Sequence, residues 1–208
     1  MSCGSVLLLA CGALARELSL LLEQGGCDHV ELDCLPAELH NTPAEIPGAV
    51  RARLEAARQR YDQIFVAYAD CGTGGRLDAL LDEYGIERLP GPHCYAFLAG
   101  EERFAALHEA EPGSFYLTDF LVRHFERLVI RGLGLDRHPE LLPDYFGNYR
   151  RVVYLAQTRS PELEARARRC AERLGLAFEI QPTGLGPLAR ALAASHVEPG
   201  RDGAAWPS

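Results

Sequence analysis

Hydrophobic positions along the chain follow two periods, one typical of buried strands and the other of amphipathic helices. Short apolar runs predict strands at 5–10, 29–35, 64–69, 151–156 and 177–180. Apolar residues spaced three or four apart predict helices at 13–24, 48–61, 76–85, 119–132 and 160–174. Strands that alternate with helices form parallel sheets through right-handed crossovers. The pattern therefore predicts an α/β fold with a mostly parallel, doubly wound (Rossmann-like) sheet and helices on both faces.

The middle and the end of the chain are less regular. Four further elements are expected there: a short fourth strand at 86–89, helical stretches at 96–109 and 139–146, and a last helix at 186–195. Neither an internal repeat nor a linker interrupts the pattern. We therefore expect a single α/β domain over residues 1–195, followed by a polar, disordered tail at 196–208.

Composition and charge exclude several functional classes. The chain has 208 residues, 48% of them hydrophobic and 24% charged, as in an ordinary globular protein. Its net charge of −8 argues against nucleic acid or an anionic membrane as a partner. All basic residues are arginine, so a lysine Schiff base and a P-loop lysine are excluded. The apolar run Val6–Ala10 is too short for a signal peptide or a membrane span, and we expect a cytoplasmic protein.

Seven cysteines form an odd set, which favours free thiols or metal ligands over disulfides in a reducing compartment. Cys11, Cys71 and Cys94 lie at the ends of predicted strands or in the turns after them, while His40 follows the second strand and His93 precedes Cys94. The carboxyl ends of parallel strands meet at one edge of a sheet. Three thiolates and one imidazole suit zinc or another soft metal. His40 and His93 are alternatives for the fourth ligand.

Other interpretations of the cysteines remain. Free cysteine is often buried as a small hydrophobic residue, which is the interpretation we favour for Cys27, Cys34 and Cys170. A cysteine that precedes a helix can also have an activated thiol, as in thiol-redox proteins, and both Cys11 and Cys71 precede helices. No resolving cysteine is near either of them in the sequence, so metal ligation ranks above redox chemistry.

The glycine-rich turn after the third strand has two interpretations. Bare backbone amides before a helix can bind a phosphate, which makes Gly72, Gly74 and Gly75 candidate cofactor-binding residues. The turn lacks both the GxGxxG pattern and a following lysine, and glycines needed only for the turn from strand to helix are the alternative.

Polar residues near the cysteines could line a pocket. Tyr68 and Asp70 flank Cys71 and, with Tyr116, are candidate catalytic residues that could donate or accept protons. His93 is a further candidate for the lining of the pocket. Asp70 could equally cap the following helix.

Five segments in combination resemble a bacterial and archaeal family known as a domain of unknown function. They are Cys-Gly-Ala-Leu-Ala-Arg-Glu (11–17), Leu-His-Asn-Thr-Pro (39–43), Cys-Gly-Thr-Gly-Gly (71–75), His-Cys-Tyr-Ala-Phe-Leu-Ala-Gly (93–100) and Ser-Phe-Tyr-Leu-Thr (114–118). Members of that family often occur near corrinoid-dependent methyltransferases, so the resemblance implies a role near methyl transfer. The motif cysteines correspond to Cys11, Cys71 and Cys94. The Leu-His-Asn motif corresponds to His40 and favours it over His93.

Taken together, these observations predict a zinc or similar metal ion held by three cysteines and His40. We expect an enzyme that acts on a small methylated amine or thiol in one-carbon metabolism. The alternatives are a protein that carries a metal or corrinoid to a methyltransferase or corrinoid-protein partner without turnover and, third, a thiol-redox protein. An exchangeable ligand and nearby acid–base groups favour the enzyme, whereas a shallow site of thiolates alone favours the carrier.

Overall fold

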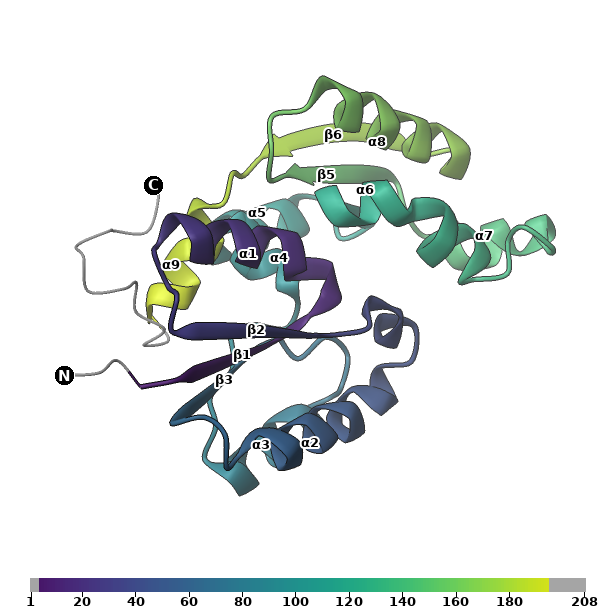
Figure 1. Ribbon diagram of the computed structural model, residues 1–208. Coiled ribbons are helices and arrows are strands. Elements are labelled where there is room, and N and C mark those ends of the chain that lie inside the picture. The colour runs from purple at the N-terminus through teal and green to yellow at the C-terminus, as the bar shows by residue number, and fades with distance from the viewer. Residues whose placement is uncertain (1–3, 195–208) are drawn as a thin grey trace. The chain divides into compact units, whose positions relative to one another are not determined.

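The structure, a computed structural model, describes residues 4–194 (Figure 1). Its chain divides into two compact units: unit 1 contains residues 4–97 and 185–194 of the described part, and unit 2 contains residues 98–184. Each unit has one three-stranded sheet, and every strand pair in both sheets is parallel. The expected tail at 196–208 lies outside the described residues. The expectation of a single domain stays a prediction.

The sheet of unit 1 has the strand order β2-β1-β3. Its strands are β1 (Val6–Cys11), β2 (Val30–Leu35) and β3 (Gln63–Ala67). All six residues of β1 are buried, as expected for the central strand of a sheet covered on both faces. The edge strand β2 alternates apolar with acidic residues and is mostly half-buried.

Helices cover both faces of this sheet, with α1 on one face and α2 and α3 on the other (Figure 1). The helices of unit 1 are α1 (Ala15–Gln24), α2 (Ile46–Ala57), α3 (Arg76–Tyr84), α4 (Cys94–Ala99), which runs on into unit 2, and α9 (Gly186–Ala194). Three short 3₁₀ segments join them, at Gly12–Leu14, Ala37–Asn41 and Pro43–Glu45. Leucines at helical spacing, such as Leu18, Leu21 and Leu22 of α1, supply the buried faces.

The sheet of unit 2 has the strand order β4-β5-β6. Its strands are β4 (Ser114–Thr118), β5 (Arg151–Ala156) and β6 (Ala177–Pro182). The helices of this unit are α5 (Glu101–Ala110), α6 (Asp119–Phe125), α7 (Leu142–Phe146) and α8 (Pro161–Leu174). Helices α6 and α8 pack against each other and share an apolar core with β4 and β5. A 3₁₀ turn at Pro139–Leu141 precedes α7.

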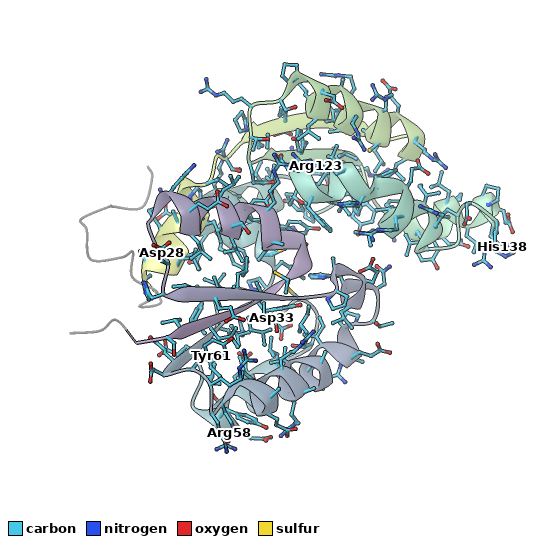
Figure 2. The ribbon with its side chains drawn as sticks, viewed as in Figure 1. Asp28, Asp33, Arg58, Tyr61, Arg123 and His138 are labelled. Carbon is cyan, nitrogen blue, oxygen red and sulfur yellow. The ribbon has the colours of Figure 1, made fainter. Side chains whose placement is uncertain are left out.

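One buried carboxylate connects two strands of unit 2. Asp119 follows β4, has no exposed surface, and accepts hydrogen bonds from the Tyr154 hydroxyl (2.7 Å) and from the backbone amides of Gln157 and Thr158 (3.1 Å each). Arg123 of α6, labelled in Figure 2, lies 3.8 Å from the same carboxylate. Because a buried charge is costly unless it is paired, this set of donors stabilises the carboxyl ends of β4 and β5 together.

The α/β prediction with parallel strands is confirmed, but the strands form two sheets rather than one. The segment 86–89 was expected to be a fourth strand, and only Arg88 in it forms a bridge, to Val66. The first sheet therefore ends at β3. The expected helix at 96–109 is broken at Gly100, whose φ of +90° is incompatible with a helix.

The expected helix at 119–132 also differs in part. His124 has non-helical backbone angles, and a π-helical stretch at Glu126–Arg131 follows α6. Within residues 4–194 we find no helix with the length and apolar character needed to cross a membrane.

Candidate functional site

The candidate site lies at the carboxyl edge of the sheet in unit 1. The strand order reverses at β1, since β2 and β3 lie on either side of it, and ligands of open α/β sheets bind at such a point. Cys11 is the last residue of β1, and Cys71 lies in the turn after β3. His40 lies in the 3₁₀ segment after β2, and Cys94 is the first residue of α4. Four separate segments thus supply the predicted metal ligands.

The imidazole of His40 lies beside Cys11. The Sγ atom of Cys11 is 3.5 Å from Nδ1 of His40 and accepts a hydrogen bond from the amide of Ala13 (3.3 Å). Nδ1 of His40 is also 3.2 Å from the carbonyl oxygen of Ala37, a contact that it would have to give up to bind a metal ion. On its other side the ring stacks on Tyr68, with the ring centroids 6.4 Å apart and the planes inclined by 14°.

Cys71 and Cys94 complete the group. A hydrogen bond with Cys94 is the largest influence on the pKa of Cys71. This bond and the hydrogen bond and charge of His40 outweigh burial and lower that pKa to about 5. The hydrogen bond to Cys71, together with burial, raises the pKa of Cys94 well above its usual value. Without a metal, Cys71 is therefore the thiolate of this pair and Cys94 is the thiol that donates to it.

Histidine 40 carries the complementary charge. Burial by itself would lower its pKa, but hydrogen bonds to the sulfurs of Cys11 and Cys71, and the charges on them, raise the pKa to about 10. A thiolate of Cys71 and an imidazolium of His40 thus stabilise each other in the metal-free protein. The two shifts describe one interaction and are not additive.

The backbone around Cys71 is held by a network that begins on α3. Asp78 of α3 binds the guanidinium of Arg88 through two hydrogen bonds, and Arg88 donates in turn to the carbonyls of Leu89 (2.7 Å) and Gly91 (3.3 Å). The amide of Cys71 donates to the carbonyl of Pro92 at 3.0 Å. This contact ties the turn that carries Cys71 to the segment that leads to Cys94, which explains why the two sulfurs meet.

Cys71 also has an unusual backbone conformation. Its φ of +50° is the only positive φ of a non-glycine residue in the described part of the chain. Such a conformation is uncommon for a residue with a Cβ atom and occurs often at functional sites.

Asp70 organises the glycine-rich turn. Its carboxylate accepts hydrogen bonds from the hydroxyl of Thr73 (2.7 Å) and from the amides of Gly74 (3.1 Å) and Gly75 (2.8 Å). The amide of Gly75 is the main reason that the pKa of Asp70 falls to about 2. Since two amides of the turn already bind this carboxylate, a phosphate would have to displace it. The geometry thus favours a structural turn, while cofactor binding by Gly72, Gly74 and Gly75 stays a prediction.

Tyr68 lies within the group of sulfurs. It is 1% exposed, and its hydroxyl interacts with the sulfur of Cys11, although the two do not form a hydrogen bond of ordinary geometry. Burial, and after it the nearby charge of Cys11, raises the pKa of Tyr68. Cys34 also contributes to this shift. Its own pKa is raised to about 11, chiefly by burial and then by Cys11 and by Asp33, which is labelled on β2 in Figure 2.

Cys34 is the residue near the site that the sequence did not indicate. In the parallel register it lies opposite Ala10, the residue before Cys11, and it is half-buried. Cys34 lies beside β1 because β2 is its neighbour in the sheet, and the sequence alone does not specify that strand order. The interpretation of Cys34 as a small buried residue stays a prediction.

Of two further predicted pocket residues, one belongs to unit 1 and the other to unit 2. The side chain of His93 is exposed and its ring contacts Tyr95, with the centroids 6.4 Å apart, whereas His40 lies among the sulfurs. Tyr116 belongs to β4 of unit 2, where its ring contacts Phe104 at 5.1 Å, and is not among the side chains that unit 1 gathers. A catalytic role for Tyr116 stays a prediction.

The four side chains converge without forming a complete coordination shell. Among residues 4–194, no set of three or more His, Cys, Asp or Glu side chains has the arrangement that holds a metal ion. The spacing between one pair of donors is nevertheless suitable. Tetrahedral zinc, with bonds of ~2.3 Å to sulfur and ~2.0 Å to nitrogen, separates the two atoms by roughly 3.6 Å. The distance between Sγ of Cys11 and Nδ1 of His40 is 3.5 Å.

Comparison with known proteins identifies a family but no function. No curated protein and no solved structure matches the chain. The family described as "Protein of unknown function (DUF1638)" matches residues 34–192, which include His40, Cys71 and Cys94, whereas Cys11 lies before the match. Because the match covers most of the 208 residues, the chain belongs to the DUF1638 family.

Proposed function

We propose that this protein binds a zinc or similar soft metal ion through Cys11, His40, Cys71 and Cys94. The observation that carries the proposal is the convergence of these four side chains from four separate segments at the carboxyl edge of one sheet. Thiolate and imidazole are the ligand types that select soft and borderline metals. The metal would supply Lewis-acid chemistry when bound.

The residues around the proposed ligands suit a catalytic metal site as well as a structural one. His40 and Cys94 are half-buried residues, whereas Cys11 and Cys71 are buried. Tyr68 is a hydroxyl donor within the group. We therefore favour an enzyme that acts on a small methylated amine or thiol. A carrier that delivers a metal or corrinoid to a corrinoid protein or methyltransferase is the alternative, and the family resemblance is its main support.

Metal analysis of the purified protein tests the proposal. Protein prepared without a histidine tag should contain about one metal ion per chain. Cys71→Ser and His40→Gln should lose most of this metal, whereas Cys170→Ser should retain it, because Cys170 lies in α8 of unit 2. A folded wild-type protein that takes up no zinc, or equal retention by all three variants, would overturn the proposal.

A second candidate function rests on the contact between Cys71 and Cys94. The sequence offers no resolving cysteine near Cys71, yet the structure puts Cys94 in hydrogen-bonding contact with it, and Cys71 is the thiolate of the pair. A thiolate next to a thiol is the arrangement of thiol-redox proteins. Oxidation would join the two sulfurs in a disulfide, with the release of two electrons and one proton to a disulfide oxidant.

Treatment of metal-free protein with oxidised glutathione tests this candidate. A disulfide between Cys71 and Cys94, detected by mass spectrometry after alkylation, should form at stoichiometric oxidant and should be absent in Cys94→Ser. Protection of both thiols by added zinc would assign the pair to metal binding instead.

A further inference from the structure

A cavity of unit 2 is rich in arginine. It lies between α6 and α8, which pack against each other, and has a volume of about 330 Å³. Its charged lining consists of Arg123 on α6, which Figure 2 labels, of Arg166, Arg169 and Arg173 on α8, and of Glu126. Four arginines against one glutamate give this lining a formal charge of +3, whereas the whole chain has a charge of −8. A cavity of this charge in an acidic protein favours an anionic ligand.

Three of these arginines form one row along α8. Arg166, Arg169 and Arg173 follow one another at intervals of three and four residues, so they share one face of the helix. They are about 5 and 6 Å apart along the helix axis. Arg168, the remaining arginine of α8, lies outside this row, and its guanidinium is 4.6 Å from the ring centroid of Phe178. The row therefore belongs to the cavity and is not a general property of the helix.

The arginines of the row have hydrogen-bond donors to spare. A guanidinium has five N–H donors. Arg166 donates to the carbonyl oxygen of Arg123 (3.2 Å), and Arg173 donates to the carboxylate of Glu126 (2.6 Å). The pair of Arg173 and Glu126 is exposed and therefore weak, so a ligand can replace the glutamate. Arg169 donates to no residue in the described part of the chain.

The rest of the lining limits the kind of anion. Val122, Phe125 and Cys170 give the cavity a buried apolar side, on which the organic part of a ligand could pack. The terminal oxygens of a phosphate monoester point in three directions, so one phosphate can bind several guanidiniums at once. A carboxylate has two oxygens in one plane and matches a single guanidinium. A row of arginines beside an apolar wall therefore suits an organic phosphate better than a carboxylic acid.

We propose that the cavity between α6 and α8 binds a small organic phosphate. Its phosphate group contacts the guanidiniums of Arg166, Arg169 and Arg173, and its organic part packs on Phe125. The cavity belongs to unit 2 and includes none of the four proposed metal ligands, so this site does not depend on the metal site.

Calorimetric titration of the full chain with phenyl phosphate, at constant ionic strength, tests the proposal. Phenyl phosphate should bind more tightly than inorganic phosphate, which lacks the organic part, and more tightly than benzoate, which lacks the phosphate. Arg169→Gln should weaken the binding of phenyl phosphate by ~10-fold or more, through the loss of hydrogen bonds to a charged group. Because Arg169 is exposed and pairs with no described residue, this variant should fold normally.

Arg168→Gln is the matched control. It makes the same change of charge one residue away on the same helix, but Arg168 pairs with Glu164 (3.5 Å) and does not line the cavity. This variant should bind phenyl phosphate as tightly as the wild type.

Each contrary outcome refutes a stated part of the proposal. Absence of phenyl phosphate binding by the wild type refutes the site. Equal losses in Arg168→Gln and Arg169→Gln would mean that general charge attraction, and not the cavity, holds the ligand. Benzoate binding as tight as that of phenyl phosphate refutes the recognition of phosphate, and equally tight inorganic phosphate refutes the contact with the organic part. A protein that binds phenyl phosphate but no metal ion refutes only the metal site.

Discussion

The contacts of two side chains, His40 and His93, show which of these histidines lies next to the cysteines. His40 and His93 have equal claims by their spacing to the cysteines, and the folded chain places only His40 next to sulfur, 3.5 Å from Sγ of Cys11. His93 is exposed. We therefore expect His93→Gln to retain metal, while His40→Gln weakens zinc affinity by a factor of ~10 or more. Competition with a zinc-sensitive dye measures both affinities, and a larger loss in His93→Gln would contradict the assignment.

The carboxylate of Asp70 should contribute to stability in a pH-dependent way. The pKa of Asp70 is lowered to about 2 from 3.8, so the folded state favours the ionised form. This stabilisation is complete above about pH 4 and is lost as the pH falls towards 2. At pH 7, Asp70→Asn should lower the free energy of unfolding by about 1–2 kcal/mol, because the amide replaces a charged acceptor of three hydrogen bonds.

Urea unfolding of the wild type and Asp70→Asn, measured between pH 7 and pH 3, checks this prediction. The difference between the two proteins should shrink at the acid end of the series. A difference that stays constant with pH would mean that the charge of Asp70 has no part in holding the glycine-rich turn.

Between elements, the site depends on the close approach of the turn after β1 to the end of β2. A Cβ atom on Gly12 would lie 2.8 Å from the carbonyl oxygen of Leu35 and 3.4 Å from the amide of Ala37, both backbone atoms that cannot move aside easily. Gly12→Ala should therefore cost about 1–3 kcal/mol of stability. It should also separate Cys11 from His40, because this contact holds their two segments together, and so weaken metal binding.

Gly48→Ala is the matched control for this prediction. Gly48 lies in α2, and a Cβ atom there would meet nothing within 4 Å. Alanine is the better helix former by about 1 kcal/mol, so this variant should be as stable as the wild type or more so. Denaturant unfolding of both variants measures the effects, and equal stability of the two would refute the steric argument.

For the molecule as a whole, unit 2 has the features of an autonomously folding segment. Residues 98–184 are continuous in sequence, contain a complete parallel sheet and enclose their own apolar core. We expect this segment to fold when expressed alone and to unfold cooperatively. Circular dichroism during thermal unfolding tests it, and a non-cooperative transition would contradict the prediction.

The buried carboxylate of Asp119 should be essential to that folding. Asp119→Ala leaves the Tyr154 hydroxyl and two backbone amides without their acceptor. The expected loss is about 3 kcal/mol or more of unfolding free energy in the isolated segment. In the full chain the same variant should leave the metal content unchanged, because the four proposed ligands belong to unit 1.

Many helices and strands can be predicted from the sequence, because the spacing of apolar residues follows the local geometry of each element. The central strand β1 is a continuous apolar run, which predicts a buried strand. Ser160 followed by proline predicts the start of α8, and in the structure the serine side chain caps the first turn of that helix. Prediction from the sequence fails for segments whose structure depends on contacts with distant parts of the chain. Residues 86–89 have the composition of a strand, but Arg88 is held by Asp78 and forms only one bridge to β3.

The sequence by itself determined the alternation of strands and helices, the parallel sheets that follow from it, and the positions of Cys11 and Cys71 at the ends of strands. Local periodicity and crossover geometry are sufficient for these features. Only the tertiary structure decided that the strands divide into two sheets and that Cys94 lies in direct hydrogen-bonding contact with Cys71. For His40, which the family resemblance already favoured over His93, it supplied the contact with Cys11. Those outcomes depend on strand order and on contacts such as that of the Cys71 amide with Pro92, which join segments far apart in the chain.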